Sequence, residues 1–206
     1  MNYDKIMIVA HPDDELLWGW KDLLREKNWL VLCITNKSRR QRRKSFLKVM
    51  DKFDCERIIL DYPDSRRQGF VWNLKTQENI LNDIKKYLHK NIKKIITHNP
   101  EGEYGHYHHK IVSKIVTNSV DKNLLYYFNF NVNKKMELSQ LFNECFKTYF
   151  PVDNYEDSMY KHKELSKITE SIHINKYDSN KMKNIIKETY SNNFLKQGIN
   201  TFNKFL

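Results

Sequence analysis

Short apolar runs that alternate with longer amphipathic stretches constrain the fold of this chain most. The first run, residues 5–10 (KIMIVA), predicts a buried strand, and the next, residues 29–34 (WLVLCI), predicts another. Between them, apolar side chains recur at helical spacing over residues 15–27, which predicts an amphipathic helix. Strands joined through helices favour a mainly parallel sheet that helices cover on both faces.

The alternation continues as far as Phe130. We expect further strands over residues 57–60, 94–97 and 124–128, and helices over residues 38–53 (with Ser38 as N-cap), 76–89 and onward from Tyr107 or His108. After Phe130 the pattern weakens, and we expect a helix over residues 156–171, a short apolar segment over residues 172–174 and a helix over residues 179–190. A chain of 206 residues with this pattern fits one α/β domain spanning residues 1–206.

The composition favours a cytoplasmic protein. No run approaches the roughly 18 to 20 apolar residues that a membrane span needs, and the N-terminus lacks the basic and long apolar regions of a secretory signal. The cysteines Cys33, Cys55 and Cys145 are isolated and show no CxxC spacing, which argues against a disulfide framework and against a cysteine metal site. We therefore expect a reducing compartment and no membrane span.

The formal net charge of +11 bears on the partners of the chain, and its densest basic run is Lys37–Lys44 (KSRRQRRK). The charge reflects either a lysine-rich coding bias or attraction to an anion, such as nucleic acid, an acidic membrane surface or a phosphorylated small molecule. No recognised nucleic-acid-binding motif and no interleaved aromatic residues accompany the run. We therefore expect a solvated helix face and no nucleic-acid partner.

Two loops hold an unusual density of residues that bind metals. Residues 11–15 (HPDDE) directly follow the first predicted strand, and residues 104–109 (YGHYHH) follow the fourth. The carboxyl ends of parallel strands meet at one edge of a sheet, where ligands bind. Three His or carboxylate ligands with one open position make a catalytic zinc site. One of two adjacent aspartates can bind the metal while the other serves as a base.

Each loop also has a plainer explanation when it is taken alone. Asp14 can cap the helix that starts at Glu15, and a histidine-rich segment can be an ordinary surface loop or bind metal adventitiously. His106 and His109 are three residues apart, so at the start of a helix both point to one face. The occurrence of both loops at one sheet edge favours a metal site. His98, after the fourth strand, is either a support of this site or a structural histidine.

The segment Val9–Glu15 (VAHPDDE) resembles the AHPDDE signature of the PIG-L/LmbE deacetylase family. Residues 102–109 (GEYGHYHH) resemble its second signature, GxYGHPDH, while Leu60–Asp64 and Tyr190–Asn192 resemble its substrate-side loop and its closing helix end. The resemblance spans nearly the whole chain. It implies an α/β, Rossmann-like three-layer sandwich with a mainly parallel sheet.

The resemblance also implies roles for individual residues. It makes His11, Asp14 and His109 the ligands of one Zn²⁺ per chain, with Fe²⁺ or another divalent metal as the alternative. It makes Asp13 the general base, and His106 the group that stabilises the oxyanion and protonates the leaving amine.

On the substrate side, the resemblance implies that Arg42 binds substrate. We also expect Asp64 to bind sugar hydroxyls and Tyr104 to line the pocket; a turn residue and a packing residue are the alternatives for these two. Three positions depart from the family pattern. Tyr107 replaces the usual proline, and His108 replaces an aspartate that orients the catalytic histidine in relatives. Ser45 replaces a glutamate on the helix of Arg42.

The expected activity is removal of the acetyl group from an N-acetylated amino sugar, such as an N-acetylglucosamine unit. If the positive net charge serves to bind the substrate, the sugar is linked to a nucleotide or another phosphate group. The alternatives are a zinc hydrolase of another amide or ester, and a sugar-binding relative without activity. We expect a small-molecule substrate, and a homo-oligomer is compatible with the sequence.

Overall fold

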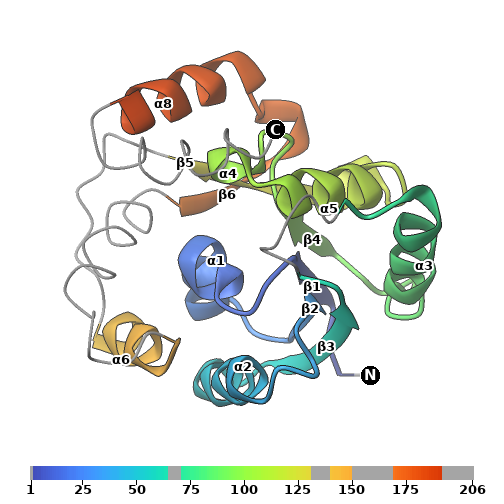
Figure 1. Ribbon diagram of the computed structural model, residues 1–206, viewed down its shortest axis with the longest axis vertical. Coiled ribbons are helices and arrows are strands. Elements are labelled where there is room, and N and C mark those ends of the chain that lie inside the picture. Colours follow the sequence, from blue (N-terminus) through green and yellow to red (C-terminus); the bar gives the residue numbers. More distant parts are fainter. Residues whose placement is uncertain (1, 65–70, 131–139, 150–168, 192–206) are drawn as a thin grey trace.

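A six-stranded sheet forms the centre of the computed structural model, which describes residues 2–64, 71–130, 140–149 and 169–191 (Figure 1). The spatial order of the strands is β3-β2-β1-β4-β5-β6. Their bounds are β1 Lys5–Val9, β2 Trp29–Thr35, β3 Glu56–Tyr62, β4 Lys94–Thr97, β5 Leu125–Phe130 and β6 Thr169–His173. Neighbouring strands are parallel except β5 and β6, which pair antiparallel. This confirms the predicted mainly parallel α/β sheet.

Helices cover both faces of the sheet (Figure 1). Their bounds are α1 Asp14–Arg25, α2 Arg40–Phe53, α3 Leu74–Lys85, α4 Gly102–Gly105, α5 Tyr107–Thr117, α6 Gln140–Tyr149 and α8 Ser179–Ser191, with short 3-10 turns at Lys122–Leu124 and Ile174–Lys176. Helices α1, α2 and α6 pack on one face, and α3 and α5 pack on the other. The result is the expected three-layer arrangement. No helix within the described residues is long and apolar enough to cross a membrane.

The side chains of the central strand β1 alternate between the two faces of the sheet, and the core is correspondingly divided into two parts. Met7 and Val9 point towards α1 and α2, whereas Ile6 and Ile8 point towards α3 and α5, and all four are fully buried. Successive side chains of a strand point to opposite faces. A strand covered on both faces therefore reads as a continuous apolar run, which is the pattern that predicted it.

The boundaries differ from the predicted ones in several places. Helix α2 begins at Arg40 and has no side-chain cap, so Ser38 is not its N-cap. The predicted helix over residues 156–171 lies mostly outside the described residues, and its last three residues belong to strand β6. Helix α6 was not predicted, although its apolar residues Phe142, Cys145 and Phe146 pack into the core at helical spacing.

The strand order explains why the two ligand-rich loops meet. From β1 the chain moves outward to β2 and β3 on one side, and it then returns to place β4 on the other side of β1. The loops that leave the carboxyl ends of β1 and β4 therefore begin side by side, and the helices that follow them, α1 and α5, lie on opposite faces of the sheet. In open parallel sheets the crevice at such a switch point is where ligands bind.

Candidate metal centre

Three side chains at this switch point bring their donor atoms together. His11 Nδ1 lies 3.3 Å from His109 Nε2 and 3.3 Å from Asp14 Oδ2, and His109 Nε2 lies 3.3 Å from Asp14 Oδ1. Tetrahedral ligands about 2.0 to 2.1 Å from a zinc ion are separated from one another by about 3.3 Å. The set of two imidazoles and one carboxylate, all buried, therefore fits a divalent ion.

The turn after β1 fixes two of these donors. Asp14 is the first residue of α1, and its Oδ2 accepts a hydrogen bond of 2.7 Å from the backbone N–H of His11. Asp13 occupies the N-cap position but makes no side-chain capping bond. The alternative in which Asp14 caps the helix is therefore wrong. Burial by itself raises the pKa of Asp14, but the imidazoles of His109, His11 and His98 lower it well below its ordinary value.

A buried carboxylate that the sequence analysis did not single out orients the third donor. Glu103 Oε2 accepts hydrogen bonds from His109 Nδ1 at 2.6 Å and from His98 Nδ1 at 2.8 Å, while its Oε1 accepts from the backbone N–H of Asn99. A histidine whose Nδ1 donates to a carboxylate presents its Nε2 lone pair, which is the usual support of a metal-binding imidazole. Glu103 has a φ of 56°, a conformation that non-glycine residues rarely adopt.

His98 supports the site from behind. Its Nε2 accepts a hydrogen bond of 3.0 Å from the backbone N–H of Ala10, and its ring stacks on His109 with centroids 3.9 Å apart. Both ring nitrogens of His98 are therefore engaged by the loop after β1 and by Glu103. This arrangement identifies His98 as a support that ties the two loops together.

Asp13 lies beside the three donors in a strained turn. Its φ is 121°, and its backbone N–H donates to Glu15 Oε2 over 3.1 Å. Arg42 Nη2 donates to Asp13 Oδ1 over 3.2 Å and to the carbonyl of Pro12 over 2.8 Å. Burial raises the pKa of Asp13 to about 6, although the Arg42 guanidinium acts in the opposite direction.

Glu15 is fully buried behind Asp13 and receives a hydrogen bond from the hydroxyl of Tyr149 on α6. Burial raises the pKa of Glu15 to about 8. Ser45, at the position where the family carries a glutamate, donates to the carbonyl of Thr148, also on α6. Helix α6 therefore supports both the Asp13 turn and the helix that carries Arg42.

His106 is half-buried and lies beside two of the three donor side chains. Its ring centroid is 4.7 Å from that of His11 and 4.5 Å from that of His109. Burial and the neighbouring His109 and His11 lower its pKa below the ordinary value for histidine. Tyr104 packs edge-on against His106 and His109, with centroids 5.7 and 5.5 Å away. The expected neighbourhood of His106, His109 and His11 is thus present.

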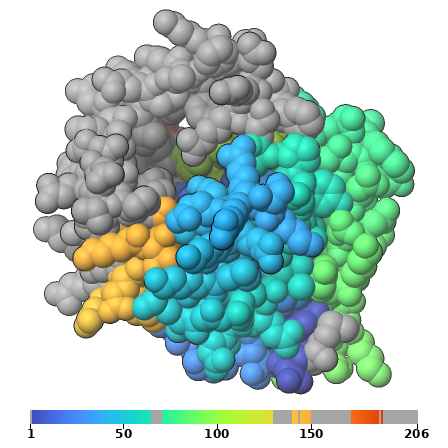
Figure 2. All heavy atoms as spheres, turned by 60° about the horizontal axis from the view of Figure 1, so that its bottom comes forward, coloured from blue at the N-terminus to red at the C-terminus, as the bar shows by residue number. Residues whose placement is uncertain are grey.

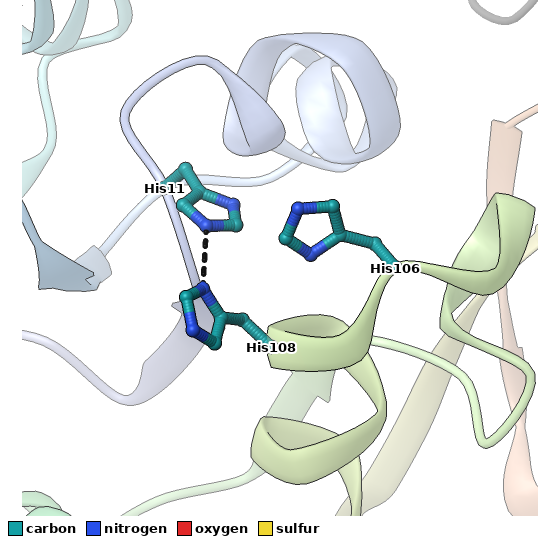
Figure 3. Close-up of side chains that lie close together, drawn as sticks. All are labelled: His11, His106 and His108. Atoms are coloured by element: carbon teal, nitrogen blue, oxygen red, sulfur yellow. Dashed lines mark hydrogen bonds between the residues drawn. The ribbon is translucent and has the colours of Figure 1, made fainter. Parts of the chain in front are cut away.

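His108 and Asp64 lie on the other side of His11. His108 Nδ1 is 3.1 Å from His11 Nε2 (Figure 3). The His108 ring stacks on Trp72 with an interplanar angle of 10°. Asp64 Oδ1 is 3.5 Å from the same Nε2, and its Oδ2 accepts from Asn36 Nδ2 over 2.9 Å. His108 therefore contacts His11 from the side opposite Asp14 and His109.

Comparisons with known proteins place the chain in a family. Residues 6–120, more than half of the chain, match the family model PIG-L, described as GlcNAc-PI de-N-acetylase. The uncharacterized protein L374 of Acanthamoeba polyphaga mimivirus is 40% identical over 119 residues, which are 50% of this chain and 52% of that protein. The chain thus matches about half the length of this curated relative.

Solved structures share the fold at low sequence identity. A deacetylase of teicoplanin biosynthesis, in complex with teicoplanin, has a TM-score of 0.58 and 13% identity, and the match covers 81% of this chain and 96% of that one. The 4-carboxy-2-hydroxymuconate hydratase GalB from Pseudomonas putida KT2440 has a TM-score of 0.51 and 11% identity, covering 79% and 84%. The fold by itself therefore does not select one reaction. The matched segment contains both ligand-rich loops, and the chain belongs to the PIG-L family.

Proposed function

We propose that the chain is a metal-dependent deacetylase that removes the acetyl group from an N-acetylated amino sugar and releases acetate and a free amine. The observation that carries this proposal is the juxtaposition of His11, Asp14 and His109, with donors 3.3 Å apart, beside a carboxyl group whose pKa is about 6. The description of the family as GlcNAc-PI de-N-acetylase supports the choice of reaction and of an N-acetylglucosamine-like substrate.

His11, Asp14 and His109 would hold the ion, which we take to be Zn²⁺. Such an ion, when bound, lowers the pKa of a coordinated water to about 7 and polarises a carbonyl group. Asp13 would remove a proton from the attacking water at its carboxylate. Burial raises the pKa of Asp13 towards the range that suits a general base at neutral pH, while Arg42 and a bound ion act in the opposite direction and favour the deprotonated carboxylate.

His106 is placed to stabilise the oxygen of the tetrahedral intermediate. Its lowered pKa means that it is a neutral imidazole at neutral pH, so an N–H of the ring donates a hydrogen bond to that oxygen. A neutral imidazole has no extra proton to give to the leaving amine. We therefore assign that proton to Asp13, which acquires it from the water in the preceding step.

The substrate side of the proposal rests on charge. The run Lys37–Lys44 includes the first residues of α2, and all of its side chains except that of Arg42 are exposed (Figure 2, light blue). This surface adjoins the Asp13 turn through Arg42 and favours a phosphate-bearing or nucleotide-linked sugar. We propose further that Tyr104 lines the sugar pocket and that Asp64 accepts bonds from sugar hydroxyls.

Arg42 is also a substrate-side candidate, but its hydrogen bonds to Asp13 and Pro12 favour a different role. A guanidinium that contacts the proposed base stabilises its charged form and lowers its pKa. We propose that Arg42 acts mainly on Asp13, and that contact with the substrate is secondary.

The test is an amine-release screen over N-acetylated sugars with and without phosphate, with other amides and esters as comparison substrates. We expect turnover of N-acetylated sugars that a chelator abolishes and added Zn²⁺ restores. Asp13→Asn should lose turnover and keep the bound metal, because the change removes the base and leaves the ligands. Turnover of only non-sugar substrates would favour the wider hydrolase alternative, and metal binding without any turnover would favour a sugar-binding relative.

A further inference from the structure

The ring of His11 has a cluster of donor atoms at each of its two nitrogens. Nδ1 faces Asp14 and His109, as described above. Nε2 faces His108 Nδ1 at 3.1 Å and Asp64 Oδ1 at 3.5 Å. His11, His106 and His108 each offer a nitrogen, and these three nitrogens lie within 4.8 Å of one another (Figure 3).

Neighbouring side chains hold His108 and Asp64 of the second cluster in place. His11 and His108 are buried, with 7% and 4% of their surface exposed. The His108 ring is fixed by its stack on Trp72, which is itself fully buried and donates to the carbonyl of Pro63. Asp64 is held by Asn36 and adds a negative charge at the rim, 4.0 Å from His108 Nδ1.

We propose that His11, His106 and His108 form a second cation site, which takes a transition-metal ion such as Zn²⁺ or Co²⁺. Three imidazole nitrogens suit these ions and suit Mg²⁺ or Ca²⁺ poorly. The separation of 3.1 Å between the nitrogens of His11 and His108 is close to the ligand spacing of about 3.3 Å around a tetrahedral zinc ion. The site exists because His108 stands where the family carries an aspartate.

The two sites share His11 and are therefore alternatives. A neutral imidazole has one lone pair for a metal, so an ion bound through Nε2 denies His11 to Asp14 and His109. An ion in the second site also engages His106. If the proposed deacetylase function holds, occupancy of the second site leaves the enzyme inactive, because it removes one ligand and His106 from the reaction.

The test measures metal binding alone, so its outcome does not depend on the reaction. Co²⁺ is titrated into metal-free Asp14→Asn, which weakens the first site and keeps an acceptor for the backbone N–H of His11. The visible absorbance of tetrahedral Co²⁺ should rise with added Co²⁺ and level off at one ion per chain. Adding His108→Phe, which keeps an aromatic ring to stack on Trp72, should abolish that stoichiometric binding.

A matched control is His173→Phe in the same background. His173 is half-buried and pairs with Tyr126 near the start of β5, at the end of the sheet opposite the site, so this change should leave Co²⁺ binding unaltered. Equal Co²⁺ binding with and without His108→Phe would overturn the proposal, as would the absence of binding in Asp14→Asn.

If the doubly substituted chain does not fold, imidazole ¹⁵N spectra of Asp14→Asn, recorded during Zn²⁺ addition, test directly whether His108 binds the ion. The His108 resonances must then change to those of a metal-bound ring, and unchanged resonances would leave the 3.1 Å contact as a hydrogen bond.

Discussion

Replacing Arg42 by methionine should move the pH dependence of the proposed reaction. Arg42 Nη2 lies 3.2 Å from Asp13 Oδ1, and the positive charge opposes the rise in pKa that burial imposes on this carboxyl group. Arg42→Met removes the charge and keeps a side chain of similar length. Asp13 must be deprotonated to act as a base. A higher pKa in the variant therefore shifts the acid limb of the kcat/KM profile to higher pH.

The size of the shift follows from the geometry. At 3.2 Å and an effective dielectric constant of about 20, the Coulomb attraction between the two charges is about 5 kcal/mol. The Arg42 side chain is 30% exposed, so water screens part of this attraction. We therefore expect the acid limb to rise by about 1 to 2 pH units, which corresponds to about 1.4 to 2.7 kcal/mol.

The assay is a pH–rate profile of the zinc-loaded wild type and variant on one N-acetylated sugar. A bound divalent ion lowers the pKa of Asp13 in both proteins, so the predicted quantity is the difference between the profiles. Near pH 9 the variant should recover most of the wild-type rate. Arg42→Lys, which keeps the charge, should keep the acid limb near the wild-type position. An unchanged limb combined with a KM that is raised at every pH would refute this reasoning and assign Arg42 to the substrate.

Two further predictions concern the support of the site and of the fold. Glu103→Gln should weaken metal affinity about 10- to 100-fold, because His109 loses the charged acceptor that orients it; calorimetric titration of the metal-free protein with Zn²⁺ measures this, and unchanged affinity would contradict the role of Glu103. Phe46 lies on α2, and its side chain is fully buried in the core. Phe46→Ala should therefore lower the free energy of unfolding by about 3 to 5 kcal/mol. Urea unfolding measures the loss, and a loss below about 1 kcal/mol would contradict the packing.

The strands that the sequence predicted best are those whose signal is local. Residues 5–10 and 29–34 are continuous apolar runs because helices cover both faces of β1 and β2. The sequence did not predict the order of the strands. The two ligand-rich loops could still be placed at the same edge, because the carboxyl ends of parallel strands meet at one edge of a sheet. His11, Asp14 and His109 were expected as ligands because the segments around them resemble two signatures of the family, and the fold brings their donor atoms to 3.3 Å from one another.

The parts of the site that the sequence did not reveal depend on contacts between distant segments. The sequence predicts a loop at Glu103, which lies in the short helix α4, and only the fold shows that its carboxylate reaches both His98 and His109. An acidic residue close to a histidine-rich segment was the signal that could have indicated it. The contact between His108 and His11 joins residues 97 positions apart, and the support of Glu15 by Tyr149 joins residues 134 positions apart. No local pattern encodes either contact.

The buried Glu15 leads to a last prediction, on the pH dependence of stability. Burial raises the pKa of Glu15 from 4.5 to about 8, so the folded chain keeps a proton that the unfolded chain releases above pH 4.5. Below pH 4.5 both states are protonated, and above pH 8 both are ionised. Between these limits the folded state binds more protons, so the contribution of Glu15 to stability falls as the pH rises.

Glu15→Gln removes this dependence, because the amide does not titrate and its oxygen still accepts from the N–H of Asp13. Urea unfolding of both metal-free proteins at pH 5 and pH 7.5 isolates the effect, since the other ionisable groups are common to both. The stability of the wild type relative to Glu15→Gln should fall by about 3 kcal/mol between these two values. A neutral Glu15 can hold the strained Asp13 turn without placing a second negative charge beside the proposed base. Parallel stability profiles for the two proteins would show that Glu15 is ionised in the folded chain, and this account of the turn would then fail.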